Sequence, residues 1–148
     1  MNKKGYILLW SVVILMVVSM VVFSHANTVS TNYNIVQSIY RSEYATQAAF
    51  GGLELAIEHY ENNPNEIYEF SNNATIGASI ELYPDINGDL TDYLILENYH
   101  IENIIAEKID DGIVRIVSKS IYEKAAREIS AVITTSETNI TVNEIIIN

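Results

Sequence analysis

The sequence predicts an α+β protein in which a long N-terminal helix packs on an antiparallel β-sheet. An uncharged apolar run at residues 6–23 leads into a helical pattern that reaches residue 62. Residues 63–148 then hold short β-rich runs separated by turn signals. We therefore expect a transmembrane helix over 6–23, its continuation over 24–62 and an antiparallel sheet domain over 63–148.

The apolar run from Tyr6 to Phe23 has the length of a membrane span. Its 18 residues include no charge, proline or glycine, and 12 of them are Leu, Ile, Val or Phe. At 1.5 Å per residue the helix is about 27 Å long, close to the thickness of a bilayer's hydrocarbon core. Lys3 and Lys4 precede it, which predicts a single pass through the cytoplasmic membrane with the C-terminal domain outside.

Charge is distributed unevenly along the chain. Its 19 acidic residues outnumber 8 basic ones, and every acidic residue lies at Glu43 or later. Such an acidic domain repels phosphate backbones, so we expect no nucleic-acid binding by it. The chain has no cysteine, which excludes disulfides and thiol catalysis.

Three fates of the apolar helix remain open from composition. Ser24-His25-Ala26 offers small residues for ordinary signal cleavage, although the run exceeds the usual apolar stretch of about 7 to 15 residues. The helix is otherwise a permanent anchor of a lone membrane protein, or it is kept for assembly with other subunits.

Lys3-Lys4-Gly5, followed at once by the apolar run, resembles the cleavage site of type IV prepilins. The resemblance implies that residues 1–5 are a prepilin leader, that prepilin peptidase cuts after Gly5, and that the new N-terminal Tyr6 is methylated. Glycine suits this position because the missing Cβ removes a clash when the peptide lies extended in the peptidase.

The predicted helix carries one apolar stripe beyond the membrane segment. Its members recur at spacings of four or five residues: Val36, Tyr40, Tyr44, Ala48 and Leu53. Such a stripe needs a sheet, a neighbouring subunit or both to lie against. We expect bends or local melting at the β-branched and Asn-rich residues 25–34 and at Gly51-Gly52, where a kink and tight packing on the sheet are the two alternatives. Pro64 predicts the end of the helix.

Residues 45–56, ATQAAFGGLELA, are similar to the corresponding helix of PilX-type minor pilins and K-type minor pseudopilins of type II secretion. This resemblance implies other pilin-like subunits and an assembly platform in the cytoplasmic membrane as partners. Most pilins have a glutamate as the fifth mature residue, where this chain has Trp10. The departure favours a minor subunit, with the filament tip as one location; alternatively, Trp10 is an ordinary membrane residue of a protein that never polymerises.

The second half predicts four or five antiparallel strands. Asp111-Gly112 is a hairpin signal, Val114–Val117 has the pattern of a strand buried on both faces, and residues 124–127 fit either a strand or a wide turn. The tail after residue 135 fits either an edge strand or a disordered end. The expected β-rich runs are Glu66–Phe70, Thr75–Tyr83, Tyr93–Glu97, Ile104–Lys108, Ile113–Tyr122 and Glu128–Thr134.

Catalytic and metal-binding patterns are weak, so we expect no enzyme activity and no cofactor. The three histidines lie far apart in sequence, and no nucleophile or phosphate-loop motif occurs. Asp85, Asn87 and Asp89 alternate as in an EF-hand loop, but Gly88 occupies the fourth place instead of the sixth. They are weak metal candidates beside the plainer interpretation of an Asn-Gly turn.

These observations predict a structural minor pilin or pseudopilin that primes, caps or modifies a type IV pilus or a type II secretion pseudopilus. The residues expected to matter are Gly5 and Tyr6 for processing, Tyr6, Trp10 and Phe23 in the membrane helix, and the helix stripe. The alternative is a membrane-anchored or secreted extracytoplasmic binding domain that does not polymerise.

Overall fold

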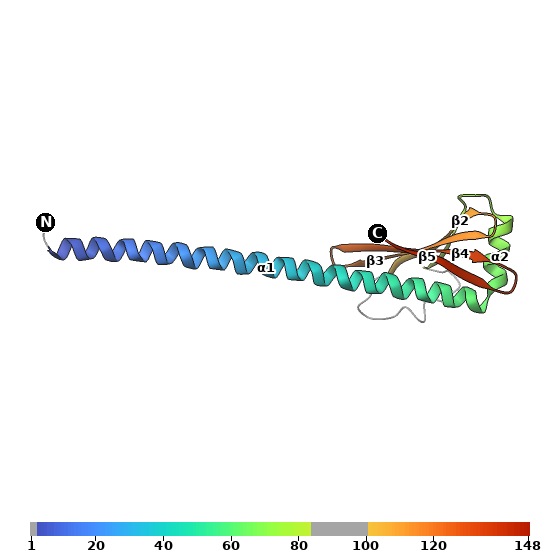
Figure 1. The fold of residues 1–148 in the computed structure, drawn as a ribbon, viewed down its shortest axis with the longest axis horizontal. Coiled ribbons are helices and arrows are strands. Elements are labelled where there is room, and N and C mark those ends of the chain that lie inside the picture. Colours follow the sequence, from blue (N-terminus) through green and yellow to red (C-terminus); the bar gives the residue numbers. More distant parts are fainter. Residues whose placement is uncertain (1–2, 84–100) are drawn as a thin grey trace. The chain divides into compact units, whose positions relative to one another are not determined.

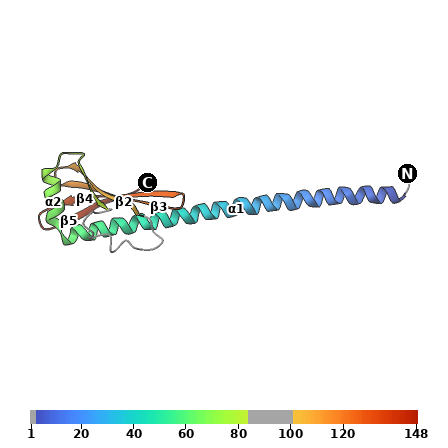
Figure 2. The ribbon, with the colours of Figure 1, turned by 180° about the vertical axis from the view of Figure 1, so that it is seen from behind.

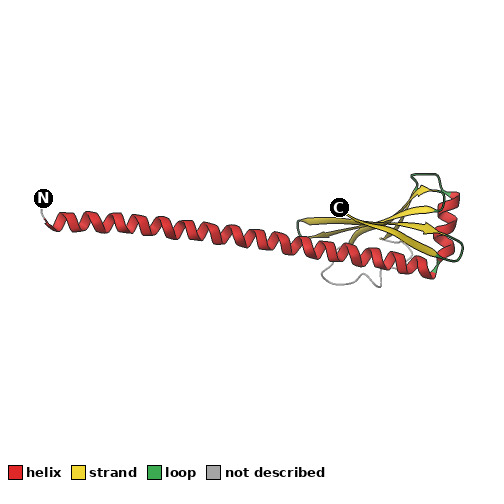
Figure 3. Cartoon of the chain, in the orientation of Figure 1, coloured by secondary structure: helices red, strands yellow, loops and turns green. Residues whose placement is uncertain are grey.

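The computed structural model describes residues 3–83 and 101–148, and within them the predicted fold class is confirmed (Figures 1 and 3). Its helices are α1 (Lys3–Asn62) and α2 (Pro64–Asn73). Its strands are β1 (Ser79–Tyr83), β2 (Ile101–Asp110), β3 (Ile113–Tyr122), β4 (Ala125–Thr135) and β5 (Ile140–Ile147). The chain divides into two units, Met1–Ile39 and Tyr40–Asn148.

Helix α1 is continuous, so the expectation of local melting at residues 25–34 and at Gly51-Gly52 was wrong, while the expected bends stay a prediction. In the first region the Thr28 and Thr31 hydroxyls donate to carbonyls four residues earlier, which satisfies them inside the helix. The propensity cost of β-branched residues is only a few tenths of a kcal/mol each. At the glycine pair, packing on the sheet holds the helix together.

The last part of α1 runs along the sheet, and α2 turns across one end of it (Figures 1 and 2). As predicted, α1 ends just before Pro64, at Asn62. Pro64 then starts α2, because its missing N–H costs nothing in the first turn of a helix. His59 Nε2 and Glu66 Oε2 lie 3.2 Å apart and link the two helices.

The predicted strand Glu66–Phe70 was wrong, because these residues belong to α2. Their apolar residues fit a period of two as well as a period near four. Ile67 and Ser71 are both fully buried, whereas Glu69, two residues from each of them, is exposed, so the burial follows the helical period and not a period of two. The next strand also begins later than expected, at Ser79, because Gly77 adopts a positive φ of 83° in the turn before it.

The sheet is antiparallel with the order β1-β2-β3-β4-β5. The predicted hairpin at Asp111-Gly112 joins β2 to β3, and Gly112 has the positive φ (70°) that such a turn requires. The alternative of a wide turn at residues 124–127 was wrong, because β4 begins at Ala125. The tail forms the edge strand β5, and the expected strand Tyr93–Glu97 lies outside the described residues.

One face of the sheet forms the core. The buried positions of β3 alternate strictly, so Val114 and Ile116 are buried while Val117 is only half-buried. The expected burial of Val114–Val117 on both faces was therefore wrong. Helix α1 covers this face with small residues between larger ones: Ala45, Ala49, Leu53, Ala56 and Tyr60 are all essentially inaccessible.

Candidate assembly surface

The membrane-length part of α1 exposes its apolar side chains on all sides. Its large apolar residues from Tyr6 to Phe23 are 42–73% exposed. The hydroxyls of Ser11 and Ser19 donate to the carbonyls of Leu8 and Leu15, at 2.8 and 2.7 Å, so these polar groups are satisfied within the helix. By length and composition, the chain therefore has one N-terminal helix able to span a membrane.

The predicted processing site and the first turns of that helix are in one element. Gly5 and Tyr6 both lie in α1. The rings of Tyr6 and Trp10 meet edge to face with centroids 6.2 Å apart, and Trp10 is 50% exposed. Phe23, at the other end of the segment, is 70% exposed.

The predicted helix stripe separates into two parts. Ala48 and Leu53 are buried in the core, and Tyr44 is half-buried. Val36 and Tyr40 are 63% and 53% exposed. Only the later part of the stripe lies on this chain's own sheet, so the earlier part is left for another surface.

The end of β3, the β3–β4 turn and the start of β4 contact α1 at the point where α1 first meets the sheet. The ring of Tyr44 stacks on that of Tyr122, with centroids 5.3 Å apart, and the Tyr40 ring lies 4.4 Å from that of Tyr44. A hydrogen bond between the two phenols of the helix raises the pKa of Tyr44. Polar contacts reinforce this aromatic stack: Arg41 pairs with Glu123, Arg127 donates to Ser42, and Ser120 donates to the Ala45 carbonyl.

Gly52 marks a close approach of α1 to the sheet. A Cβ at this position would lie 2.5 Å from Ser118 Oγ and 3.0 Å from Ile101 Cδ1. A Cβ at Gly51 would meet nothing within 4 Å. Of the two alternatives for the glycine pair, tight packing is thus the one found, and only one of the two glycines provides it.

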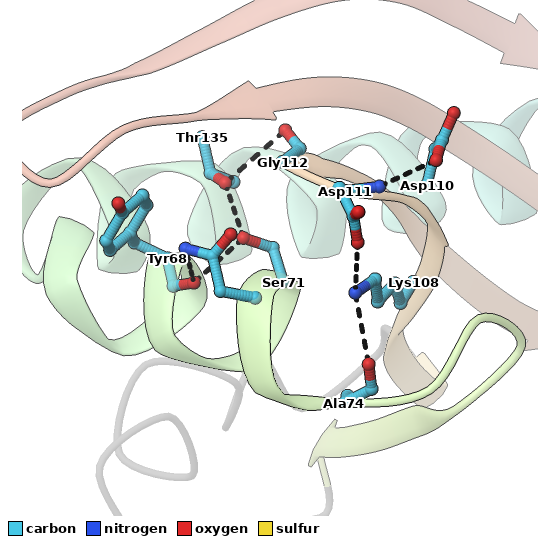
Figure 4. A network of polar contacts seen from close by, with 9 residues as sticks. Tyr68, Ser71, Ala74, Lys108, Asp110, Asp111, Gly112 and Thr135 are labelled. Carbon is cyan, nitrogen blue, oxygen red and sulfur yellow. Dashed lines mark hydrogen bonds and ion pairs between the residues drawn. The ribbon is translucent and has the colours of Figure 1, made fainter.

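A buried lysine fastens the other end of the sheet to α2 (Figure 4). Lys108 is 97% buried, and its Nζ donates to the Ala74 carbonyl at 3.0 Å and to Asp111 Oδ1 at 2.8 Å. Ala74 caps the C-terminus of α2, where a positive charge is favourable. Beside it, the hydroxyls of Ser71 and Thr135 are 2.8 Å apart. This lysine is a structural residue.

Three buried polar atoms have no hydrogen-bond partner among the described residues: Tyr60 Oη, Arg115 Nε and Ser118 Oγ. Burial raises the pKa of the Tyr60 phenol, and the charge of Glu66 raises it further. The weak metal candidates Asp85, Asn87 and Asp89 lie outside the described residues, and residues 3–83 and 101–148 hold no cluster of three potential ligands.

Two features were not recognised from the sequence alone. Lys108 follows Ile104 and Ala106 at the period of a strand, so its place on the buried face was readable. On β5, Val142, Ile145 and Ile147 are 38%, 49% and 59% exposed. The apolar residues of this tail are visible in the sequence. Which of them point to the face of the sheet that α1 covers depends on the strand register.

Comparisons with known protein families, curated proteins and solved structures find no match to this chain. The architecture itself, a long apolar N-terminal helix packed on an antiparallel sheet, is compatible with a pilin-like fold.

Proposed function

We propose that this chain is a structural, non-catalytic minor subunit of a pilus-like filament, which primes, caps or modifies a type IV pilus or a type II secretion pseudopilus. One observation carries the proposal: a single unbroken helix includes both a membrane-length apolar segment and the surface that packs on an antiparallel sheet. Its partners would be prepilin peptidase, other pilin-like subunits and a membrane assembly platform.

The composition of the helix supports assembly through the apolar segment. Between Tyr6 and Tyr40 no Asp, Glu, Lys or Arg occurs, so this part of α1 can enter a bundle of similar helices without burying an unpaired charge. Trp10 occupies the place of the usual pilin glutamate. A subunit without this acid cannot neutralise a neighbour's N-terminal amine, which favours a minor role over that of the bulk filament subunit.

The test is the intact mass and N-terminal sequence of the protein recovered from its own cell membranes. A chain beginning at methylated Tyr6 supports the proposal. A chain beginning at Asn27 identifies a discarded signal, and one beginning at Met1 identifies a plain anchor; either result refutes it.

A variant pair tests whether the cut depends on Gly5. Gly5→Val should leave the protein uncut, because a β-branched side chain hinders the extended peptide at the cleavage position. Gly51→Ala is the matched control, since its new methyl group meets open space, and it should be processed normally. A full-length product from both variants, or a cut product from both, contradicts the role of Gly5.

A further inference from the structure

Three apolar side chains of β5 lie on the core face of the sheet and are still 38–59% exposed. Val142, Ile145 and Ile147 pair with Ile133, Ala131 and Ile129 of β4. Directly paired residues of an antiparallel ladder point to the same face, and all three β4 partners are completely buried. We call Val142, Ile145 and Ile147 the β5 strip.

The place of α1 on the sheet explains the exposure of the β5 strip. Helix α1 contacts Ile101 of β2, Ser118 and Ser120 of β3 and Arg127 of β4, and none of these residues belongs to β5. Strands are spaced about 4.8 Å apart, so β5, two strands beyond β3, lies about 10 Å to one side. Packed helices are separated by about 8–10 Å, so the surface over β5 suits one further helix lying beside α1.

The chain itself contains a helical segment with matching properties. Val29, Tyr33, Val36 and Tyr40 are spaced by four, three and four residues, so they share one face of α1, and they are 53–67% exposed. This face is about 16 Å long at 1.5 Å per residue, and the β5 strip is about 17 Å long at 3.4 Å per residue. We call residues 29–40 the helix stripe segment.

We propose that the β5 strip of one subunit binds the helix stripe segment of a second copy of this chain. Charge favours the helix stripe segment of the second copy over its β5 strand as the partner of the β5 strip. All 19 acidic residues lie at Glu43 or later, so pairing two sheets brings like charges together, whereas residues 29–40 carry no charge. Glu144, the one acidic residue of β5, pairs with Val132 and lies on the opposite face of the sheet from the strip.

The contact is too small to hold two free subunits together. Seven side chains cover well below the roughly 1,200 Å² typical of a stable complex. It therefore operates where copies are already concentrated along their helices, and in this respect it rests on the proposed function. A pair of copies joined in this way would be a first step in priming a filament.

Cysteine crosslinking tests the proposal in full-length protein, because the native chain has no cysteine. Two differently tagged copies are produced together in the native cell, one with Val36→Cys and the other with Ile145→Cys. Mild oxidation should give a disulfide-linked pair carrying both tags. Both positions are about half exposed or more, so the substitutions should leave the fold intact, which near-ultraviolet circular dichroism checks.

Matched controls move each cysteine to the opposite face. Ser38→Cys lies on the far side of α1 from Val36, and Glu144→Cys lies on the far side of β5 from Ile145. Either exchange should lower the yield of the linked pair at least tenfold. Equal yields from all pairs, or linkage only between two Ile145→Cys copies, would overturn the proposal.

The N-terminal sequence of the same samples separates this proposal from the proposed function. Linked pairs in unprocessed, membrane-held protein would support the contact and refute the pilin-like role. Processed protein in sheared filaments without the Val36–Ile145 disulfide would overturn the contact and leave that role intact.

Discussion

Replacing Gly52 by alanine tests a close helix–sheet contact. The new Cβ would lie 2.5 Å from Ser118 Oγ, whereas ordinary van der Waals contact begins near 3.4 Å. Ser118 is completely buried and packed in the core face of β3, so its hydroxyl has little room to retreat. Overpacking of this kind costs about 1–3 kcal/mol.

The neighbouring glycine supplies the matched control. Gly51→Ala has open space around its Cβ and should stabilise the helix by about 1 kcal/mol, the ordinary propensity gain. Gly52→Ala receives the same gain but also the clash, so its free energy of unfolding should lie about 1–3 kcal/mol below that of Gly51→Ala. The comparison of the two variants cancels the propensity term.

A double variant isolates the cause of the loss. Ser118→Ala removes the atom nearest the new methyl group, and Ser118 Oγ has no hydrogen-bond partner among the described residues, so its removal alone should cost little. Gly52→Ala combined with Ser118→Ala should recover most of the lost stability, leaving only the flexible Ile101 side chain to adjust.

Urea unfolding of the full chain in detergent micelles, followed by near-ultraviolet circular dichroism, measures the unmodified protein, the three single variants and the double variant. Its signal comes largely from tyrosines, of which Tyr44, Tyr60 and Tyr122 lie in or beside the helix–sheet contact. If Gly52→Ala is as stable as Gly51→Ala, the close approach of α1 to β3 is wrong. If the double variant shows no recovery, the clash is not with Ser118.

Two further predictions concern buried polar groups and use the same unfolding measurement. Lys108→Met should change the free energy of unfolding by less than about 1 kcal/mol, because its partner Asp111 is 85% exposed and can be hydrated. Asp111→Asn should cost about 1–3 kcal/mol, because it leaves the buried ammonium without a carboxylate. A larger loss from Lys108→Met than from Asp111→Asn would contradict a buried lysine. Burial raises the pKa of Tyr60 above its ordinary 10.0, so its contribution to stability is complete below pH 10 and declines as pH rises further. Tyr60→Phe removes a hydroxyl without a partner among the described residues, so it should stabilise the fold by about 1 kcal/mol. It should also flatten the decline in stability above about pH 10. An unchanged slope of stability against pH would show that Tyr60 does not cause the decline.

The sequence predicts an element well where a turn signal and composition agree. The bounds of β3, Ile113–Tyr122, are those expected, because Asp111-Gly112 fixes its start and β-branched and aromatic residues are frequent along it. The run Glu66–Phe70 failed because its few apolar residues satisfy both periods. Tertiary contact decides between them: Ile67 and Ser71 reach the core while Glu69, two residues from each, is exposed, which a period of two does not allow.

The candidate surfaces were predictable only in part. The apolar run and the stripe through Val36 and Tyr40 are local patterns, and both lie on one helix as expected. Which of the two glycines meets the sheet, and which face of β5 carries the strip, depends on register. The irregularity between Val132 and Ile133 brings Val142 onto the same face as Ile145, although the two are three residues apart.

Charge then constrains how copies associate. Six of the 8 basic residues lie with all 19 acidic residues after residue 40, so two such domains repel, whereas the helix up to Tyr40 is uncharged beyond Lys4. Any attraction between copies must therefore come from apolar burial against this repulsion. Salt shortens the screening length from about 8 Å at 0.15 M to about 3 Å at 1 M. It therefore weakens the electrostatic repulsion between the acidic domains but not the apolar attraction between the copies. The yield of the Val36–Ile145 disulfide should accordingly rise with salt while the Ser38 control stays low, and a yield that falls with salt would show that complementary charges, and not the apolar stripe, bring the copies together.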